Sequence, residues 1–414
     1  MLRLLVPIVL LLALVGVSVF SDNPAPRADL VFINSSDVNT LDPQRMSWMH
    51  DLRTARLLFQ PLVQNDVLSD DFDIIPGVAE SWEISDDART YTFHLRHDAK
   101  WSNGEPVTAE DFRYSWRRAM LPDLVSDYVA MFMNIDGATE FYDWRLAQLD
   151  AFSDRDFANA SERQQAAYDL WDETHAQFDA LVGMQAPDPQ TLVVRLSKPV
   201  PYFLDICAFG VFAPVYEPLV AQYERPDPQT GRLIRRPGWT QGGVLISNGP
   251  FILTRWRMKR DMRLEKNPYF WDRDNIAIDS IDIPSINDPN AGVLAYQTGA
   301  VDWIADVTAP YRGEMVAQSS NTSPSTPSRS SSSGLRGSTS SVSIACSRPI
   351  PAPTHTPSRP SGPTSTTSTA SPSSPTGSPT RSLMPACAGP LPCASTSGPS
   401  PIRCADWASP SPAP

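Results

Sequence analysis

The stretch "PGVAESWEISDDARTYTFHLRHDAKWSNGEPVTAEDF", residues 76–112, has the pattern of two strands followed by a helix. Its second strand alternates, so that Tyr91, Phe93 and Leu95 point to one face of a sheet and the polar residues between them point to the other. The turn "SDDA" joins this strand to the shorter strand "WEIS", and "SNGEPV" supplies the next turn. The stretch therefore predicts an ordered α/β unit.

The predicted helix begins at "TAED", where Thr108 caps the free N–H groups of the first turn and Asp111 reaches back to the cap. Apolar residues recur at helical spacing along it, with basic residues between them. The predicted buried stripe is Phe112, Ser115, Trp116, Ala119 and Met120, and the residues predicted to face away are Arg113, Arg117 and Arg118. This pattern indicates a helix that packs on a sheet, and it requires no chemistry.

Strands and helices continue to mix along the chain, which favours an α/β fold. The sequence predicts a strand at 30–34, a helix that ends at Pro61, and polar helices over 140–180. Farther on, "GPFILTRW" and "DMRLEKNPYFWD" predict a hairpin, and "IDSIDIPSI" predicts another strand. A helix and a short strand are expected in "PNAGVLAYQTGAVDWI".

The composition changes abruptly after Gln318, because residues 319–414 hold 28 Ser, 19 Pro and 12 Thr. Such a segment cannot bury enough apolar area to offset an ordering cost of ~1–2 kcal/mol per residue, so we expect a disordered, low-complexity tail. Two interpretations stay open: a glycosylated stalk, or translation out of frame. The second is favoured, since the change falls in the middle of an α/β unit.

The residues before the tail include 28 basic and 45 acidic side chains, a net charge of about −17. Because phosphate binding needs clustered Lys and Arg, this balance excludes nucleic acid as the expected partner. Residues 1–21 contain Arg3 and then a long apolar run, which predicts a signal peptide or an uncleaved N-terminal anchor. We therefore expect a periplasmic or otherwise extracytoplasmic protein, either free or tethered to the membrane. Cys207 lies in an apolar run and is expected to be a buried free thiol.

No signature of catalysis occurs before the tail: GxGxxG, GxxxxGK(S/T), GxSxG and HExxH are all absent. His94 and His97 are three residues apart on a predicted strand, so their rings diverge and do not suggest a metal site. Glu110 and Asp111 are explained as acids at a helix start. We expect no catalytic residue, metal or cofactor.

Aromatic residues near turns leave two interpretations open, core packing or the lining of a cleft. This set comprises Trp48, Trp101, Tyr128, Trp239, Trp256, Tyr269 and Trp271.

The sequence resembles the family 5 extracellular solute-binding proteins, the oligopeptide- and dipeptide-binding components of ABC importers. The resemblance rests on "PGVAESWEISDDARTYTFHLRHDAKWSNGEPVTAEDFRYSW", with "LDPQ", "LLFQPLV", "LSKPVPYF", "SNGPFILTRW" and "RLEKNPYFWD" in the same order. It implies a type II periplasmic-binding-protein fold, whose two lobes close on a ligand about a hinge. The first lobe would span 28–270, with a small inserted domain at about 61–190. The second lobe would start at 271–318 and be largely missing, so that the chain is incomplete at its C-terminus.

The resemblance also implies where a ligand binds. In the peptide binders the ligand backbone pairs with a short extended segment after "LDP", which here falls on Ser47, Trp48 and Met49. By the same comparison Tyr128 would line the cleft and Asn248 would lie near its floor.

The function implied is the capture of a small peptide, or another small solute, for delivery to an ABC transporter membrane permease by a monomeric, non-enzymatic protein. Nickel chelates, sugars and haem are alternative ligands within the family. We expect capture to be impaired, because a clamp needs both lobes. The alternative is a secreted or surface structural protein whose Ser/Thr/Pro-rich tail is a stalk.

The coding DNA distinguishes the two interpretations of the tail. If residues 319–414 are translated out of frame, one of the other two frames downstream of codon 318 should restore alternating strand and helix patterns. Stop codons in both of those frames would instead support the stalk. Sequencing of the locus and translation in three frames makes the measurement.

Overall fold

The computed structural model describes residues 26–307 and 309–313. The predicted signal peptide or anchor at 1–21 and the predicted tail at 319–414 lie outside these residues. Within the described part of the chain, no helix is both long and apolar enough to cross a membrane.

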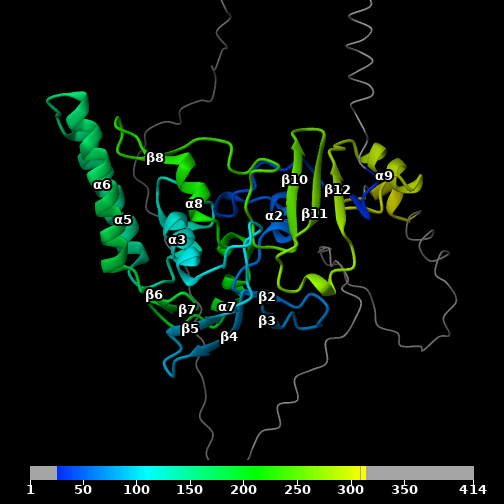
Figure 1. The fold of residues 1–414 in the computed structure, drawn as a ribbon, viewed down its shortest axis with the longest axis horizontal. Coiled ribbons are helices and arrows are strands. Elements are labelled where there is room, and N and C mark those ends of the chain that lie inside the picture. Colours follow the sequence, from blue (N-terminus) through cyan, green and yellow to red (C-terminus); the bar gives the residue numbers. More distant parts are fainter. Residues whose placement is uncertain (1–25, 308, 314–414) are drawn as a thin grey trace, which may run out of the picture. The chain divides into compact units, whose positions relative to one another are not determined.

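A five-stranded sheet joins segments from the two ends of the described chain, in the order β10-β11-β12-β1-β13 (Figure 1). β1 is parallel to β12 and β13, whereas β10, β11 and β12 are antiparallel neighbours. The strands are β1 (Leu30–Ile33), β10 (Phe251–Arg257), β11 (Asp261–Lys266), β12 (Ser280–Pro284) and β13 (Trp303–Ile304). The hairpin predicted from "GPFILTRW" and "DMRLEKNPYFWD" is therefore confirmed as β10 and β11. The lobe boundary expected at residue 270 does not coincide with a change of sheet, because β12 and β13 lie in the same sheet as β1.

A second sheet is formed entirely between β1 and β10 along the chain, in the antiparallel order β4-β5-β7-β6. Its strands are β4 (Ala79–Ile84), β5 (Thr90–Leu95), β6 (Met184–Asp188) and β7 (Thr191–Arg195). Tyr91, Phe93 and Leu95 of β5 are buried, which confirms the alternation predicted from the sequence. The insertion expected at about 61–190 thus has a sheet of its own.

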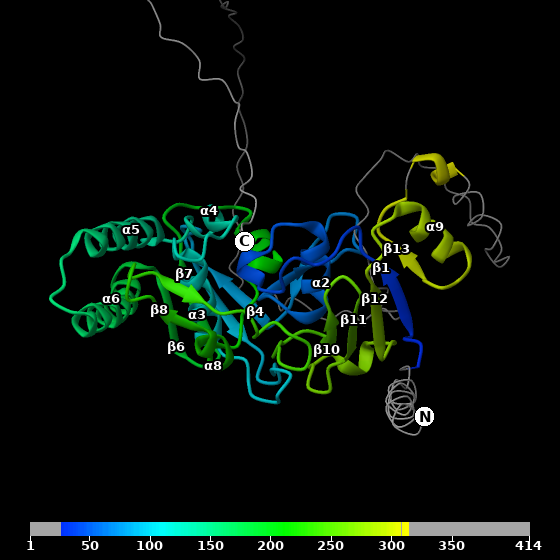
Figure 2. The same ribbon diagram turned by 90° about the horizontal axis from the view of Figure 1, so that it is seen from above.

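The remaining elements surround these two sheets (Figures 1 and 2). The longer helices are α2 (Met49–Leu58), α3 (Ala109–Met120), α5 (Ala138–Asp154), α6 (Ala160–Leu181) and α9 (Pro289–Gln297), and the short ones are α4 (Val129–Phe132), α7 (Phe203–Cys207) and α8 (Glu217–Val220). Two small hairpins pair β2 (Val63–Asn65) with β3 (Ile74–Pro76), and β8 (Glu224–Pro226) with β9 (Leu233–Arg235). Both views show α5 and α6 side by side, as the polar helical pattern over 140–180 predicted.

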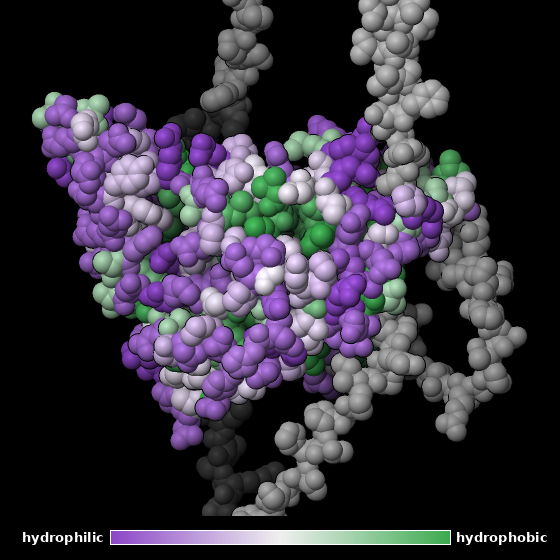
Figure 3. All heavy atoms as spheres, viewed as in Figure 1, coloured by the Kyte–Doolittle hydropathy of each residue, from purple (hydrophilic) through white to green (hydrophobic). Residues whose placement is uncertain are grey.

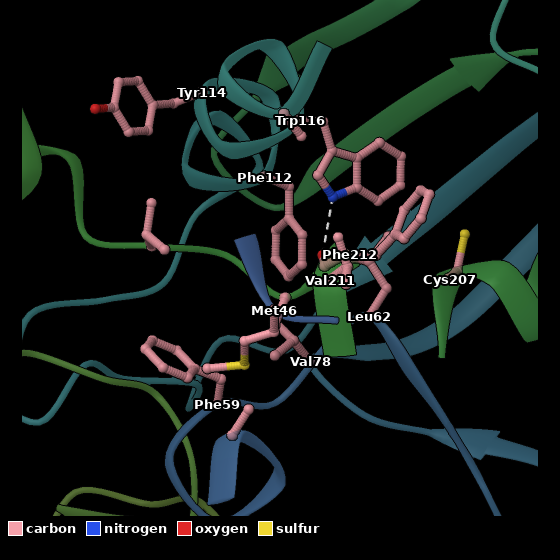
Figure 4. Close-up of a cluster of buried hydrophobic side chains, with 14 of the residues drawn as sticks. Met46, Phe59, Leu62, Val78, Phe112, Tyr114, Trp116, Cys207, Val211 and Phe212 are labelled. Carbon is pink, nitrogen blue, oxygen red and sulfur yellow. Dashed lines mark hydrogen bonds between the residues drawn. The ribbon is translucent and has the colours of Figure 1, made fainter. Parts of the chain in front are cut away.

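Aromatic side chains from distant parts of the sequence form the centre of the core (Figure 4). Trp116 on α3 donates its indole N–H to the Phe212 carbonyl over 2.8 Å, and the Phe212 ring stacks on Phe132 with 4.0 Å between centroids. Each fully buried ring of this kind contributes roughly 1.5–3 kcal/mol of hydrophobic stabilisation. Cys207 is a buried free thiol, as predicted.

Helix α3 begins as the sequence predicts, because the Asp111 carboxylate accepts hydrogen bonds from the Thr108 N–H and hydroxyl at 2.7 and 2.9 Å. Its predicted apolar stripe is buried. The prediction that the basic residues face away was wrong for Arg117 and Arg118, which are both buried. The helix has neighbours on more than one side, and a hydrophobic stripe reports only the side that packs on apolar groups.

Arg118 is the centre of a buried polar network and is only 2% exposed. Its Nη1 and Nη2 donate to the two carboxylate oxygens of Asp42 at 2.8 and 2.6 Å, and its Nε donates to Glu224 at 2.8 Å. Nη1 also donates to the side-chain oxygen of Gln44 at 3.0 Å. One guanidinium therefore ties the "LDPQ" turn and β8 to helix α3.

Replacing Arg118 with Ala should destabilise the protein by about 3–5 kcal/mol, because two buried carboxylates lose their partner. The matched control is Arg113→Ala on the same helix, whose ion pairs with Glu110 and Asp179 are part-exposed, and which should cost at most about 1 kcal/mol. Urea unfolding followed by circular dichroism measures both. Equal losses in the two variants would contradict a special role for the buried network.

Candidate functional site

A cleft with a volume of about 980 Å³ lies beside the network of Arg118. Residues from three segments line it, at 39–51, 235–242 and 256–258. On the face drawn in Figure 3, hydrophobic residues gather between the positions that α8 and β10 have in Figure 1. Exposed apolar surface of this kind commonly marks a site of interaction.

One wall of the cleft is a short extended segment, Met46–Trp48, between the turn that contains Asp42 and helix α2. Met46 and Trp48 have extended backbone angles, with ψ values of 136° and 145°. Met46 points into the buried cluster of Figure 4, whereas the Trp48 side chain is 62% exposed. The backbone is therefore extended at both residues, without the regular alternation of side chains that a strand has.

This segment has backbone groups that are available for a new neighbour. Among the described residues, the N–H groups of Ser47 and Trp48 and the carbonyl of Met46 have no hydrogen-bond partner. The Ser47 carbonyl accepts only a long bond, 3.5 Å, from the Tyr128 hydroxyl. An extended segment with free N–H and C=O groups is a template for pairing with another extended chain.

Of the residues predicted to bind a ligand, Ser47 and Trp48 line the cleft. Tyr128 does not line the cleft, but its hydroxyl donates to the Ser47 carbonyl at 3.5 Å. Its ring contacts that of Phe209, with 4.9 Å between centroids. Met49 is 63% exposed, but it is the first residue of α2 and not part of an extended segment, which corrects that expectation. A ligand-binding role for these residues stays a prediction.

Asn248 does not lie on the surface of the cleft, contrary to its expected place near the floor. It is 3% exposed, its Oδ1 accepts from the Gln60 N–H at 3.0 Å, and its Nδ2 donates to the Gln60 carbonyl at 2.8 Å. Both ends of the amide are thus used to hold the chain just after α2. A role in positioning explains this side chain better than contact with a ligand.

The aromatic set divides between the two interpretations that the sequence left open. Trp48, Trp239 and Trp256 line the cleft, whereas Trp101 is fully buried in the core. Trp271 donates its indole N–H to the Gln60 side chain at 2.7 Å.

Two carboxyls among the lining residues are buried, that of Asp42, which Arg118 binds, and that of Asp51 near the start of α2. The Asp51 carboxylate has no arginine partner among the described residues. Its Oδ1 accepts from the Asn39 N–H at 2.8 Å, and its Oδ2 has no hydrogen-bond partner in the described part of the chain. Burial raises the pKa of Asp51, although the neighbouring Asn39 N–H and His50 act in the opposite direction.

Sequence reasoning missed Arg45, Arg235 and Arg236, which also line the cleft. The available signal was a basic pair directly before the turn "PGWT". The cleft contains no assembled metal site, because no group of three or more His, Cys, Asp or Glu residues within 26–307 and 309–313 is arranged to hold an ion.

An aromatic-lined cleft with an unpaired extended wall is suited to binding a small, extended ligand. Residues 73–350 match the model of the bacterial extracellular solute-binding proteins, family 5 Middle, and the chain belongs to this family. The family resemblance and the fold class drawn from the sequence are thereby confirmed. Members of this family that match the chain are named as solute-binding proteins and not as enzymes.

Among similar proteins is the periplasmic oligopeptide-binding protein OppA of Escherichia coli K12, 30% identical over 280 residues, which are 67% of this chain and 43% of that protein. OppA of Bacillus subtilis is 31% identical over 227 residues, 55% of this chain and 34% of the relative. The chain thus spans less than half the length of these relatives.

Solved structures of solute-binding proteins are also similar to this chain. The structure of OppA from Burkholderia pseudomallei superposes with a TM-score of 0.56 at 26% identity, covering 71% of this chain and 49% of that one. The unliganded open form of MppA, a periplasmic murein tripeptide-binding protein, superposes with a TM-score of 0.55 at 26% identity, covering 71% and 48%.

Replacing Asn248 with Ala should lower the free energy of unfolding by about 2–4 kcal/mol, because the buried N–H and C=O of Gln60 both lose their partner. Asn287→Ala, at an exposed position, is the control and should change it by less than about 0.5 kcal/mol. Chemical denaturation makes the comparison. An unchanged midpoint for the Asn248 variant would show that the amide does not hold the segment.

Proposed function

We propose that this chain captures peptides outside the cytoplasm as the solute-binding component of an ABC importer. The observation that carries the proposal is the extended segment Met46–Trp48, which borders the cleft with unpaired backbone groups. Membership of family 5 and the names of the relatives support the same function and do not favour the stalk protein that was the alternative.

The binding step follows from backbone chemistry. An extended peptide that lies along this segment can accept from the Ser47 N–H and donate to the Ser47 carbonyl, because the N–H and C=O of one residue in an extended chain point to the same side and those of its neighbours point to the other. Each such bond contributes roughly 0.5–1.5 kcal/mol net, and none depends on the side chains of the ligand. The exposed Trp48 ring, stacked on His50 with 6.0 Å between centroids, adds apolar contact for whatever side chain lies beside it.

The wider assignment has four further parts. The protein is exported, and residues 1–21 either are cleaved or tether it to the membrane. It delivers its ligand to a membrane permease, it acts as a monomer without catalysing a reaction, and its acidic charge keeps it from nucleic acid. The residues proposed to contact the ligand are Ser47, Trp48, Met49 and Tyr128, whose hydroxyl lies against Ser47.

The test separates recognition of the main chain from recognition of the side chain. Ser47→Pro removes the Ser47 N–H, and Met46 already has the extended backbone that a following proline requires. Ser47→Ala keeps the N–H and removes only the hydroxyl. Binding of tri-alanine, measured by isothermal titration calorimetry, should fall about tenfold in the proline variant and stay unchanged in the alanine variant.

The folded state should be equally stable in both variants, because the N–H of Ser47 has no partner to lose in the free protein. Equal binding by the wild type and the proline variant would rule out pairing at this segment. Loss of binding in the alanine variant alone would point to recognition by the hydroxyl.

A further inference from the structure

Three arginines line the cleft although the residues before the tail carry a net charge of about −17. Arg45 ends the short turn Pro43–Arg45, directly before the proposed ligand wall Met46–Trp48. Arg235 ends strand β9, and Arg236 follows it directly. Segments far apart in the sequence thus bring three guanidinium groups to one cavity.

None of the three forms an ion pair with a carboxylate in the described part of the chain. Arg235 donates to the Asp123 carbonyl at 3.0 Å and Arg236 to the Gln222 carbonyl at 2.8 Å, and both acceptors are neutral. The side chain of Arg45 has no hydrogen bond or ion pair among the described residues. These charges are held at the cleft without being neutralised there.

The acids close to the cleft are already engaged. Asp42 and Glu224 are bound by Arg118 at 2.6 and 2.7 Å. Asp51 is buried and accepts from the backbone of Asn39. Counting Arg118, four guanidinium groups and three carboxylates (Asp42, Asp51 and Glu224) lie at or beside the cleft, which leaves a net charge of +1.

Electrostatics at Arg235 agree with this imbalance. Burial lowers the pKa of Arg235, and the like charges of Arg45 and Arg118 lower it further, outweighing the smaller attractions of Asp42 and Glu224. An anion between Arg45 and Arg235 would relieve this repulsion, and guanidinium groups bind carboxylates with paired, charge-assisted hydrogen bonds.

We propose that Arg45 and Arg235, with Arg236 beside them, form an anion site in the cleft that takes a carboxylate group of the bound peptide. The identity of the ligand as a peptide rests on the proposed function, whereas the anion site does not. The carboxylate is supplied either by the C-terminus of the peptide or by an acidic side chain. The cleft would then prefer anionic peptides to neutral ones.

The experiment uses the full chain and the fluorescence of its tryptophans, three of which line the cleft. The probes are tri-alanine, its C-terminal amide, and the amides of Ala-Glu-Ala and Ala-Gln-Ala, so that terminal and side-chain carboxylates are tested separately. Citrate is a fifth probe that needs no peptide pairing. The variant is R45Q/R235Q, with R45Q alone in case the double variant folds poorly, and R232Q is the control, because Arg232 is exposed and does not line the cleft.

In at least one of the two pairs, tri-alanine against its amide or the Ala-Glu-Ala amide against the Ala-Gln-Ala amide, the anionic peptide should bind about tenfold or more tightly than the neutral one. The R45Q/R235Q variant should lose this difference in affinity, and the R232Q variant should keep it. Citrate binding should also fall in the R45Q/R235Q variant. Neutral and anionic peptides that bind equally would overturn the anion site and leave peptide capture intact.

Citrate binding that depends on Arg45 and Arg235, without binding of any peptide, would support the anion site and overturn peptide capture. If neither citrate nor any peptide binds, both are wrong.

Discussion

The buried guanidinium of Arg118 is the constraint on which the ligand side of this protein depends. It binds Asp42, Gln44 and Glu224 at once, and all four side chains are shielded from water. A charge in such a place is tolerated only when every partner is present. The turn after β1, the helix α3 of the inserted domain and the hairpin of β8 and β9 must therefore assemble together.

This constraint explains why a short segment can act as one wall of a cleft. Met46 is fixed from below by the aromatic core, and the turn before it is fixed by Arg118. Helix α2 begins immediately after Trp48, and its far end is held where Asn248 binds both backbone groups of Gln60. Three residues with little structure of their own are thus held extended at both ends, which lowers the entropy that a ligand must remove on binding.

The cleft offers two kinds of contact: backbone groups that do not distinguish one ligand side chain from another, and arginines that favour an anionic ligand. Hydrogen bonds from backbone groups at 46–48 do not depend on the side chains of a peptide ligand, so they would suit the binding of peptides with many different sequences. The arginines at 45, 235 and 236 would favour an anionic ligand, because none of them forms an ion pair with a carboxylate among the described residues. The nearby Asp42 and Glu224 bind Arg118 directly instead.

Local pattern in the sequence was sufficient for the elements of the fold. Strand alternation at Tyr91, Phe93 and Leu95, the cap at Thr108, and the hairpin of β10 and β11 depend on near neighbours, and each was predicted. The order of motifs also sufficed to indicate the family and to direct attention to Ser47 and Trp48.

The tertiary structure alone decided which polar groups are buried and which charges meet. Arg118 lies on the polar side of an amphipathic pattern, yet residues 76 positions earlier and 106 positions later bury it. In the sequence Asn248 has the pattern of a loop residue, whereas in the structure both ends of its side-chain amide bond to the backbone of Gln60, 188 positions away. Likewise β1 and β12 come from opposite ends of the described chain, and only the folded protein brings them together as parallel neighbours. These features come from contacts between distant segments, and periodicity within one segment carries no information about them.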